Sequence, residues 1–196
     1  MCNDFKFQVK WRSRGPLTFD KSQLSDQLKH AIRDVPNFPK PGIVFKDVTP
    51  VLLDSGLFGA AVTGMAKPYR AAGITRVVAI ESRGFLFGAP IALSLGAGLV
   101  PIRKPGKLPA ATRRIEYALE YGTDALEMHH DAIEAGDRVL IVDDVLATGG
   151  TASAAAQLVG ATGGDVVGFT FLIELEFLKG RQRLTGKRIE ALLRYA

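Results

Sequence analysis

Four short apolar segments, separated by stretches with helical character, constrain the fold of this chain most. They are VVAI (77–80), LVPI (99–102), VLIV (139–142) and VVGFTFLI (166–173). Each is rich in branched residues, as expected of strands that are buried on both faces of a parallel sheet. Helices are predicted at 85–95 and 151–161. This alternation predicts an α/β fold, with a doubly wound, mainly parallel sheet flanked by helices.

The segment before this alternation is predicted to form a small cap, or hood, over the strand ends. Four apolar residues recur at helical spacing after Ser22, a suitable N-cap: Leu24, Leu28, Ile32 and Val35. Prolines then end the helix, an extended run follows at 43–45, and a second helix is predicted over 57–72. Residues 1–20 are expected to be a flexible extension. Residues 21–196 then form a single domain, a common size for one core.

The second half of the chain contains two further predicted elements. Residues 115–121 and 126–130 predict a hairpin around the turn at 122–124. The chain from Ile189 to the C-terminus predicts an additional edge strand.

Cysteine content and hydropathy exclude several classes of protein. Cys2 is the single cysteine, so no intrachain disulfide can form and no zinc-cluster spacing is present. A reducing, cytoplasmic location is therefore expected. No apolar run approaches the roughly 18 residues of a membrane span, so no membrane association is expected. The first twenty residues lack the apolar stretch of a secretory signal, whereas an organelle-targeting role for them stays open.

The net charge of +5 is compatible with nucleic acid, an anionic membrane surface or a phosphorylated small molecule. Residues 103–114 contain five basic residues and no acidic residue, and they are interrupted by proline and glycine, which predicts a basic loop. Aromatic residues do not alternate with these bases, which argues against single-stranded nucleic acid. We therefore expect no nucleic-acid partner. A merely solvated loop is the alternative for these charges.

The segment VLIVDDVLATGGT (139–151) contains the residues most suited to chemistry. Two glycines after a strand permit a tight turn and close approach of the backbone to a ligand. Peptide N–H groups of such a turn, at the start of a helix, bind anions, and Thr148 and Thr151 add hydroxyl donors. A nucleotide-binding P-loop would carry a lysine here, and this segment has none. The pattern predicts a phosphate monoester site.

Asp143 and Asp144 distinguish this turn from other phosphate sites. The two carboxylates stand where a sugar attached to the bound phosphate would lie. They can accept hydrogen bonds from ribose hydroxyls, directly or through Mg²⁺, or stabilise positive charge on the sugar. The alternative interpretation is a helix-capping turn after a core strand.

The whole motif resembles the signature with which type I phosphoribosyltransferases bind phosphoribosyl pyrophosphate (PRPP), and its ATGGT ending resembles the adenine branch of that family. Three further regions are similar to the same branch: NFPKPGIVFKDVTPVL (37–52), ESRGFLFGAPIALSLG (81–96), and IRKPGKLP with LEYG (102–109, 119–122). The similarity extends from about Leu24 to the C-terminus. It implies a transferase that joins adenine to the ribose 5-phosphate of PRPP, releasing AMP and pyrophosphate in purine salvage.

The resemblance also implies roles for individual residues. The PRPP-binding residues are Asp143, Asp144, Ala147, Thr148, Gly149, Gly150, Thr151, Arg83, Arg103, Lys104, Lys107 and Tyr121. In the family, the counterpart of Arg103 reaches the PRPP site across the interface of a homodimer. Mg²⁺ is implied as the cofactor, held mainly by PRPP and pyrophosphate, with no direct protein ligand.

Adenine binding and proton transfer fall on other segments. The resemblance implies that backbone groups of Val44 and Lys46 contact the purine edge, while Phe45 and Val145 sandwich its face. It makes Glu120 the catalytic acid or base near the purine N7. Residues 105–121 are the expected flexible lid, which closes the site against water.

Two alternatives stay open on the sequence. The base could be hypoxanthine, guanine, xanthine or orotate instead of adenine. The chain could also be a non-catalytic regulator of the same fold, which binds RNA or a nucleotide, although the intact acid pair and Glu120 argue against loss of catalysis.

Overall fold

The central sheet of the molecule contains five parallel strands. The computed structural model describes residues 21–118 and 123–196. The sheet consists of β3 (Arg76–Ile80), β4 (Gly98–Ile102), β7 (Arg138–Leu146), β8 (Asp165–Leu175) and β9 (Arg188–Tyr195). Their order is β4-β3-β7-β8-β9, and each neighbouring pair is parallel. The predicted α/β architecture is confirmed, and the predicted edge strand is β9.

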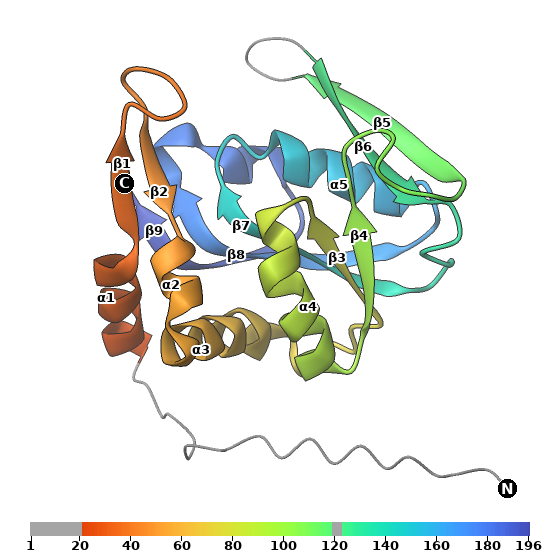
Figure 1. Ribbon diagram of the computed structural model, residues 1–196. Coiled ribbons are helices and arrows are strands. Elements are labelled where there is room, and N and C mark those ends of the chain that lie inside the picture. Colours follow the sequence, from red (N-terminus) through yellow and green to blue (C-terminus); the bar gives the residue numbers. More distant parts are fainter. Residues whose placement is uncertain (1–20, 119–122) are drawn as a thin grey trace, which may run out of the picture.

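Helices cover both faces of this sheet (Figure 1). One face carries α1 (Lys21–Ala31), α2 (Thr49–Leu53), α3 (Ser55–Ala66) and α4 (Arg83–Leu95), and the other carries α5 (Gly150–Gly160). Successive strand residues point to opposite faces. Val77 and Leu140 accordingly belong to the core beneath α3 and α4, whereas Val78 and Ile141 belong to the core beneath α5. Along the described chain, no helix has the length and apolar character needed to cross a membrane.

A small antiparallel pair of strands forms the predicted N-terminal hood. It consists of β1 (Arg33–Pro36) and β2 (Val44–Asp47). The first helix was predicted to continue to Val35, and this is wrong, because α1 ends at Ala31. Val35 instead pairs with Phe45 in the ladder, so pairing with a distant strand overrides the local helical spacing.

The helix predicted over 57–72 is shorter and begins earlier. Asp54 caps α3 by accepting hydrogen bonds from the N–H groups of Gly56 and Leu57, at 2.8 and 3.0 Å. After Ala66 the chain tightens into the 3₁₀ turn η1 (Lys67–Tyr69). Pro68 has no N–H to continue the α-helical pattern, which explains the change.

An antiparallel hairpin, β5 (Thr112–Ala118) and β6 (Thr123–His129), lies beside α5 (Figure 1). The predicted hairpin is confirmed, but its strands begin earlier than predicted. Arg113 and Arg114 therefore lie in β5, paired with Met128 and Glu127, and not in a loop. Residues 119–122, which include Glu120 and Tyr121, lie outside the described residues.

Candidate active site

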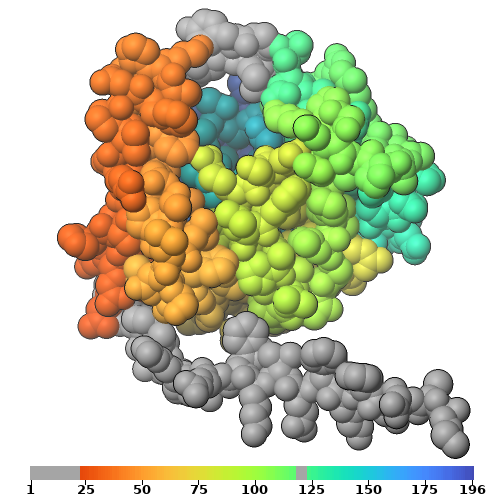
Figure 2. All heavy atoms as spheres, in the orientation of Figure 1, coloured from red at the N-terminus to blue at the C-terminus, as the bar shows by residue number. Residues whose placement is uncertain are grey.

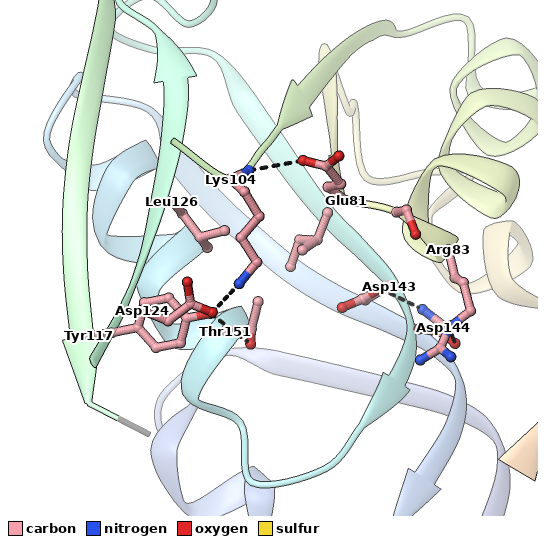
Figure 3. A pocket seen from close by; sticks show the side chains of 11 residues that line it. Glu81, Arg83, Lys104, Tyr117, Asp124, Leu126, Asp143, Asp144 and Thr151 are labelled. Atoms are coloured by element: carbon pink, nitrogen blue, oxygen red, sulfur yellow. Dashed lines mark hydrogen bonds and ion pairs between the residues drawn. The ribbon is translucent and has the colours of Figure 1, made fainter. Parts of the chain in front are cut away.

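A cavity opens at the carboxyl ends of the parallel strands, where α/β sheets bind their ligands. Its volume is about 340 Å³, enough for a small phosphorylated molecule. Figure 2 shows the hollow between the N-terminal hood and the hairpin region, with the α5 region at its floor. Polar side chains from the turn after β3, α4, the loop after β4, the hairpin, β7 and the start of α5 line it: Glu81, Ser82, Arg83, Lys104, Tyr117, Asp124, Asp143, Asp144 and Thr151. The fold thus brings together segments that are distant in the sequence (Figure 3).

The two predicted carboxylates occupy the end of β7. Asp144 is buried, with 3% of its surface exposed, and Arg83 Nε lies 2.5 Å from its Oδ2 atom. This ion pair does not include a hydrogen bond, so Asp144 Oδ2 is a buried acceptor without a hydrogen-bond partner in the described part of the chain. Such an atom is costly unless a ligand donates to it. The site therefore has an acceptor suited to a hydroxyl group.

Asp143 has a different environment. Its Oδ1 atom accepts a hydrogen bond from the N–H of Asp144 at 2.9 Å. Desolvation and the neighbouring charge of Asp144 together raise the pKa of Asp143 well above its ordinary value. Two adjacent carboxylates of this kind favour a ligand that donates hydrogen bonds or carries positive charge.

The loop after β7 leads directly into the N-terminus of α5. Gly149 has φ +78°, a left-handed conformation suited to glycine, and α5 begins at Gly150. A second, smaller cavity of about 60 Å³ is lined by the residues of this loop. Because the first N–H groups of a helix have no partner within it, the loop and helix can together bind an anion. Thr151 lines both cavities and connects the two parts of the site.

A polar cluster forms the opposite wall. Lys104 Nζ contacts Asp124, whose Oδ2 also accepts from the Tyr117 hydroxyl at 3.1 Å. The Tyr117 oxygen lies 3.4 Å from Thr151 Oγ1, so the hairpin contacts the start of α5 (Figure 3). Partial burial opposes ionisation of Lys104, but its hydrogen bond with Asp124 raises its pKa overall. Lys104 is therefore a charged group facing the cavity.

Arg103 and Lys107, the other predicted bases of this loop, do not line the cavity. Arg103 Nη2 donates to Glu81 Oε1 at 2.8 Å, and its Nη1 donates to the carbonyl oxygen of Lys107 at 2.8 Å. The hydrogen bond from Arg103 lowers the pKa of Glu81, which stays ionised. The Lys107 side chain is exposed to solvent. In the single chain, Arg103 thus fixes the loop after β4 by hydrogen bonds to Glu81 and to the main chain of Lys107.

The residues predicted for the base lie in the hood and at the end of β7. The guanidinium of Arg83 lies over the Phe45 ring, 4.8 Å from its centroid, and so connects the hood with the acid pair. The Lys46 side chain points elsewhere: its Nζ is 2.6 Å from Asp34 Oδ1 and 4.2 Å from the centroid of the Tyr195 ring. Only main-chain groups of Lys46 are then free to contact a ligand in the cavity.

Four polar side chains of the cavity were not predicted from the sequence: Glu81, Ser82, Tyr117 and Asp124. Tyr117 and Asp124 face each other across the hairpin. The sequence predicted a turn at 122–124, which put Asp124 outside a strand, and therefore did not predict that it pairs with Tyr117. The correct hairpin register would have brought both residues to the site.

The described residues give the cavity oxygen atoms suited to a metal ion, but only part of a ligand set. In the described parts of the chain, no three His, Cys, Asp or Glu side chains are arranged to hold a metal ion. The carboxylates of Asp143 and Asp144 provide oxygen atoms, which Mg²⁺ prefers. The site therefore fits an ion whose remaining ligands come from a bound phosphate compound.

Comparison with known proteins decides the family. The model of the phosphoribosyl transferase domain matches residues 51–188. The chain belongs to the phosphoribosyltransferase family, in its adenine phosphoribosyltransferase branch. The adenine phosphoribosyltransferase of Myxococcus xanthus is 57% identical over 180 residues, which cover 92% of this chain and 97% of that protein.

Solved structures of this family have the same fold. The adenine phosphoribosyltransferase of Rhodothermus marinus is 54% identical, with a TM-score of 0.86 over 89% of this chain and 99% of that one. The enzyme of Saccharomyces cerevisiae, solved with an imino-altritol bisphosphate and adenine, is 41% identical, with a TM-score of 0.83 over 88% of this chain and 99% of that one. The resemblance found in the sequence is thus confirmed over nearly the whole length.

Proposed function

We propose that this enzyme transfers the 5-phosphoribosyl group of PRPP to adenine, giving AMP and pyrophosphate. The observation that carries the proposal is the acid pair of β7 followed by the start of α5, in a chain that matches adenine phosphoribosyltransferases over nearly their full length. The local geometry provides a site for a sugar phosphate, and the family membership supplies the donor and the base.

The 5′-phosphate of PRPP binds in the smaller cavity. Backbone N–H groups of Ala147, Gly149 and Gly150 and the hydroxyls of Thr148 and Thr151 surround it, and the dipole of α5 favours its negative charge. The ribose then extends toward β7, where Asp143 and Asp144 accept hydrogen bonds from its hydroxyl groups. Asp144 Oδ2, which is buried and accepts no hydrogen bond in the described part of the chain although Arg83 lies beside it, supports this assignment.

The pyrophosphate group occupies the larger cavity between Arg83 and Lys104. Both side chains line this space, and their charges neutralise the leaving group as the bond breaks. Lys107 and Tyr121 complete the group of predicted pyrophosphate ligands once the lid closes, and Arg103 contributes to the site of the partner subunit across the dimer interface. Bound Mg²⁺ would supply further neutralisation of the pyrophosphate oxygens, near Asp143 and Asp144.

The base enters beneath the hood. Phe45 and Val145 stack on the two faces of adenine, and main-chain groups of Val44 and Lys46 contact its edge. Arg83 must leave the Phe45 ring to admit the base, and its movement toward pyrophosphate would accomplish this.

The reaction is a displacement at the anomeric carbon through an oxocarbenium-like transition state. N9 of adenine forms the new bond as the bond to the pyrophosphate oxygen breaks. Asp143 and Asp144 stabilise the positive charge that develops on the ribose. Glu120, between β5 and β6 in the sequence, handles the proton near the purine N7, and the lid excludes water from the site.

The expected homodimer has support on the surface of α4. Leu86 and Leu93 lie seven residues apart on one side of that helix and are 45% and 84% exposed. Leu99 of β4, the edge strand next to α4, is 43% exposed. An exposed apolar surface of this kind is typical of a protein interface. A cytoplasmic location stays a prediction.

A panel of bases tests the proposal. The purified chain is incubated with PRPP, MgCl₂ and adenine, hypoxanthine, guanine, xanthine or orotate, and nucleotide and pyrophosphate are quantified by chromatography. We expect AMP and an equal amount of pyrophosphate from adenine, and little product from the other bases. Absence of AMP would exclude the adenine assignment, and absence of any PRPP-dependent product would support the non-catalytic regulator.

A further inference from the structure

The rear side of the phosphate loop, facing away from the cavity, is packed against a second loop. Gly149 of the phosphate loop and Gly180, in the 3₁₀ turn η3 (Gly180–Arg183), approach each other backbone to backbone. A Cβ atom on Gly180 would overlap the carbonyl oxygen of Ala147 and lie 3.0 Å from Leu146 Cδ1. A Cβ atom on Gly149 would overlap the carbonyl oxygen of Gly180. The position of one loop therefore determines the position of the other.

Arg181, the next residue, fixes η3 to the sheet. Its Nε and Nη2 atoms donate to the two carboxylate oxygens of Glu174, at 2.5 and 2.7 Å. Its Nη1 atom donates to the carbonyl oxygen of Ile189 in β9 at 3.1 Å. Because a planar guanidinium that makes two parallel bonds has a fixed orientation, this contact holds η3 more rigidly than a single charge pair would.

Glu174 is buried in β8, beside the end of β7 from which the phosphate loop begins. It is 3% exposed, and it stands opposite Leu146, the last residue of β7, in the ladder between β7 and β8. Arg194 of β9 approaches its other side, with Nε 3.6 Å from Oε2. A carboxylate so buried is stable only while its cationic partners remain. The chain thus maintains an ion pair between a buried carboxylate and a partly exposed arginine directly behind the phosphate loop, at a point where none of its atoms lines either cavity.

We propose that Glu174 and Arg181 are positioning residues, which hold Gly180 against the phosphate loop and so keep residues 147–149 in the geometry that receives a 5′-phosphate. This inference about Glu174 and Arg181 rests on the proposed function only in assigning the 5′-phosphate to that loop. Apart from the hydroxyls of Thr148 and Thr151, the phosphate contacts are backbone groups, which cannot adjust by rotating a side chain. A displacement of the loop by a fraction of an ångström therefore weakens several of them together.

A purely structural role for the ion pair predicts a different result. Loss of stability alone would lower the melting temperature and leave the affinity of the folded protein for its ligands unchanged. A positioning role instead predicts that the variants bind one ligand more weakly and a second ligand normally. Ribose 5-phosphate uses the phosphate loop, whereas pyrophosphate binds on the other side of the acid pair, between Arg83 and Lys104. Neither ligand contains a base, so the comparison holds whichever base the enzyme uses.

The experiment measures the dissociation constants of ribose 5-phosphate and pyrophosphate by calorimetry, with melting temperatures, in four variants of the full chain. Gly180→Ala displaces the loop contact without altering the ion pair, and Arg181→Lys keeps the charge but loses the paired hydrogen bonds. Gly160→Ala, at the end of α5 where a Cβ meets no atom within 4 Å, and Arg183→Lys, on the exposed part of η3, are the matched controls.

We expect both test variants to bind ribose 5-phosphate on the order of 10-fold more weakly and to bind pyrophosphate within about 2-fold of the wild type. KM for PRPP should rise while KM for adenine stays unchanged, and the controls should match the wild type. Equal weakening of both ligands, or a lower melting temperature with unchanged ribose 5-phosphate affinity, would overturn the inference. Wild-type protein that binds ribose 5-phosphate but does not convert adenine would contradict the proposed function alone.

Discussion

At the scale of single residues, the ionised form of Asp143 is electrostatically unfavourable in the folded protein. The pKa of this carboxyl is raised in the folded protein, first by desolvation and then by the charge of Asp144. The native state therefore holds its proton to a higher pH than the unfolded chain does. The stability that protonation contributes is fully present below the unfolded pKa, which is about 3.9 for an aspartate, and it is lost as the pH rises through the folded value.

Asp143→Asn should consequently stabilise the protein at neutral pH. The amide keeps an oxygen that can accept from the N–H of Asp144, but it cannot ionise. We expect a melting temperature ~2–4 °C above the wild type at pH 7.5, which corresponds to on the order of 1 kcal/mol for a chain of this size. The difference should shrink toward pH 4, where the wild-type group is protonated. A variant that is less stable than the wild type at pH 7.5 would contradict this assignment.

Asp124 is a second residue whose role can be tested alone. It pairs with Lys104, and this pair lowers the pKa of Asp124 although partial burial opposes the shift. In Asp124→Asn, Lys104 loses its counterion and becomes free to attract a phosphate group. We expect pyrophosphate to bind up to about 5-fold more tightly, since a partly exposed ion pair contributes ~1 kcal/mol or less.

Calorimetric titration with pyrophosphate measures this effect. Asp131→Asn, at an exposed position just after the hairpin, provides the matched loss of one negative charge. Weaker pyrophosphate binding in Asp124→Asn would mean that Asp124 orients Lys104 for pyrophosphate instead of competing with pyrophosphate for Lys104.

At the scale of elements, the buried strands and the phosphate loop were predictable, whereas the peripheral strands were not. The strand at 139–142 is wholly apolar and its glycine turn is explicit, so local signals suffice for β7 and the start of α5. The β1 strand has the sequence RDVP, with two charged residues and a proline, and exists because it pairs with β2. Likewise, the meeting of Tyr117 with Thr151 depends on how the hairpin packs on α5, which no local pattern contains.

Helix packing on the sheet gives a prediction at this scale. Gly88 of α4 lies so close to β3 that a Cβ atom would stand 2.5 Å from Ala79 Cβ, whereas a Cβ on Gly59 of α3 meets no atom within 4 Å. Gly88→Ala should therefore destabilise the protein by ~1–3 kcal/mol through overpacking. Gly59→Ala should instead stabilise it by up to ~1 kcal/mol, because alanine favours the helix. Urea denaturation of both variants measures the two free energies, and the same sign for both would refute the packing argument.

At the scale of the whole molecule, the two edges of the sheet differ. The β4 edge carries the exposed leucines next to α4, whereas β9 forms the opposite edge. If the first surface forms the homodimer, Leu93→Glu should yield monomers by light scattering at concentrations where the wild type is dimeric. Phe177→Glu replaces another apolar residue, 61% exposed, that follows β8 near the other edge, and it should leave the dimer intact.

The dimer also determines where Arg103 acts. In the single chain, Arg103 pairs with Glu81 and does not line the cavity, whereas the family resemblance implies that its counterpart acts across the interface. Arg103→Ala and Asp144→Asn subunits, each with little activity alone, are therefore mixed under conditions that exchange subunits. If Arg103 acts in the partner's site, a mixed dimer contains one intact site, and about a quarter of wild-type activity should return, because half of the dimers are mixed at random pairing. If Arg103 serves its own site, every site carries a defect and the mixture stays inactive. Mixing each variant with Leu93→Glu subunits, which cannot pair, provides the control.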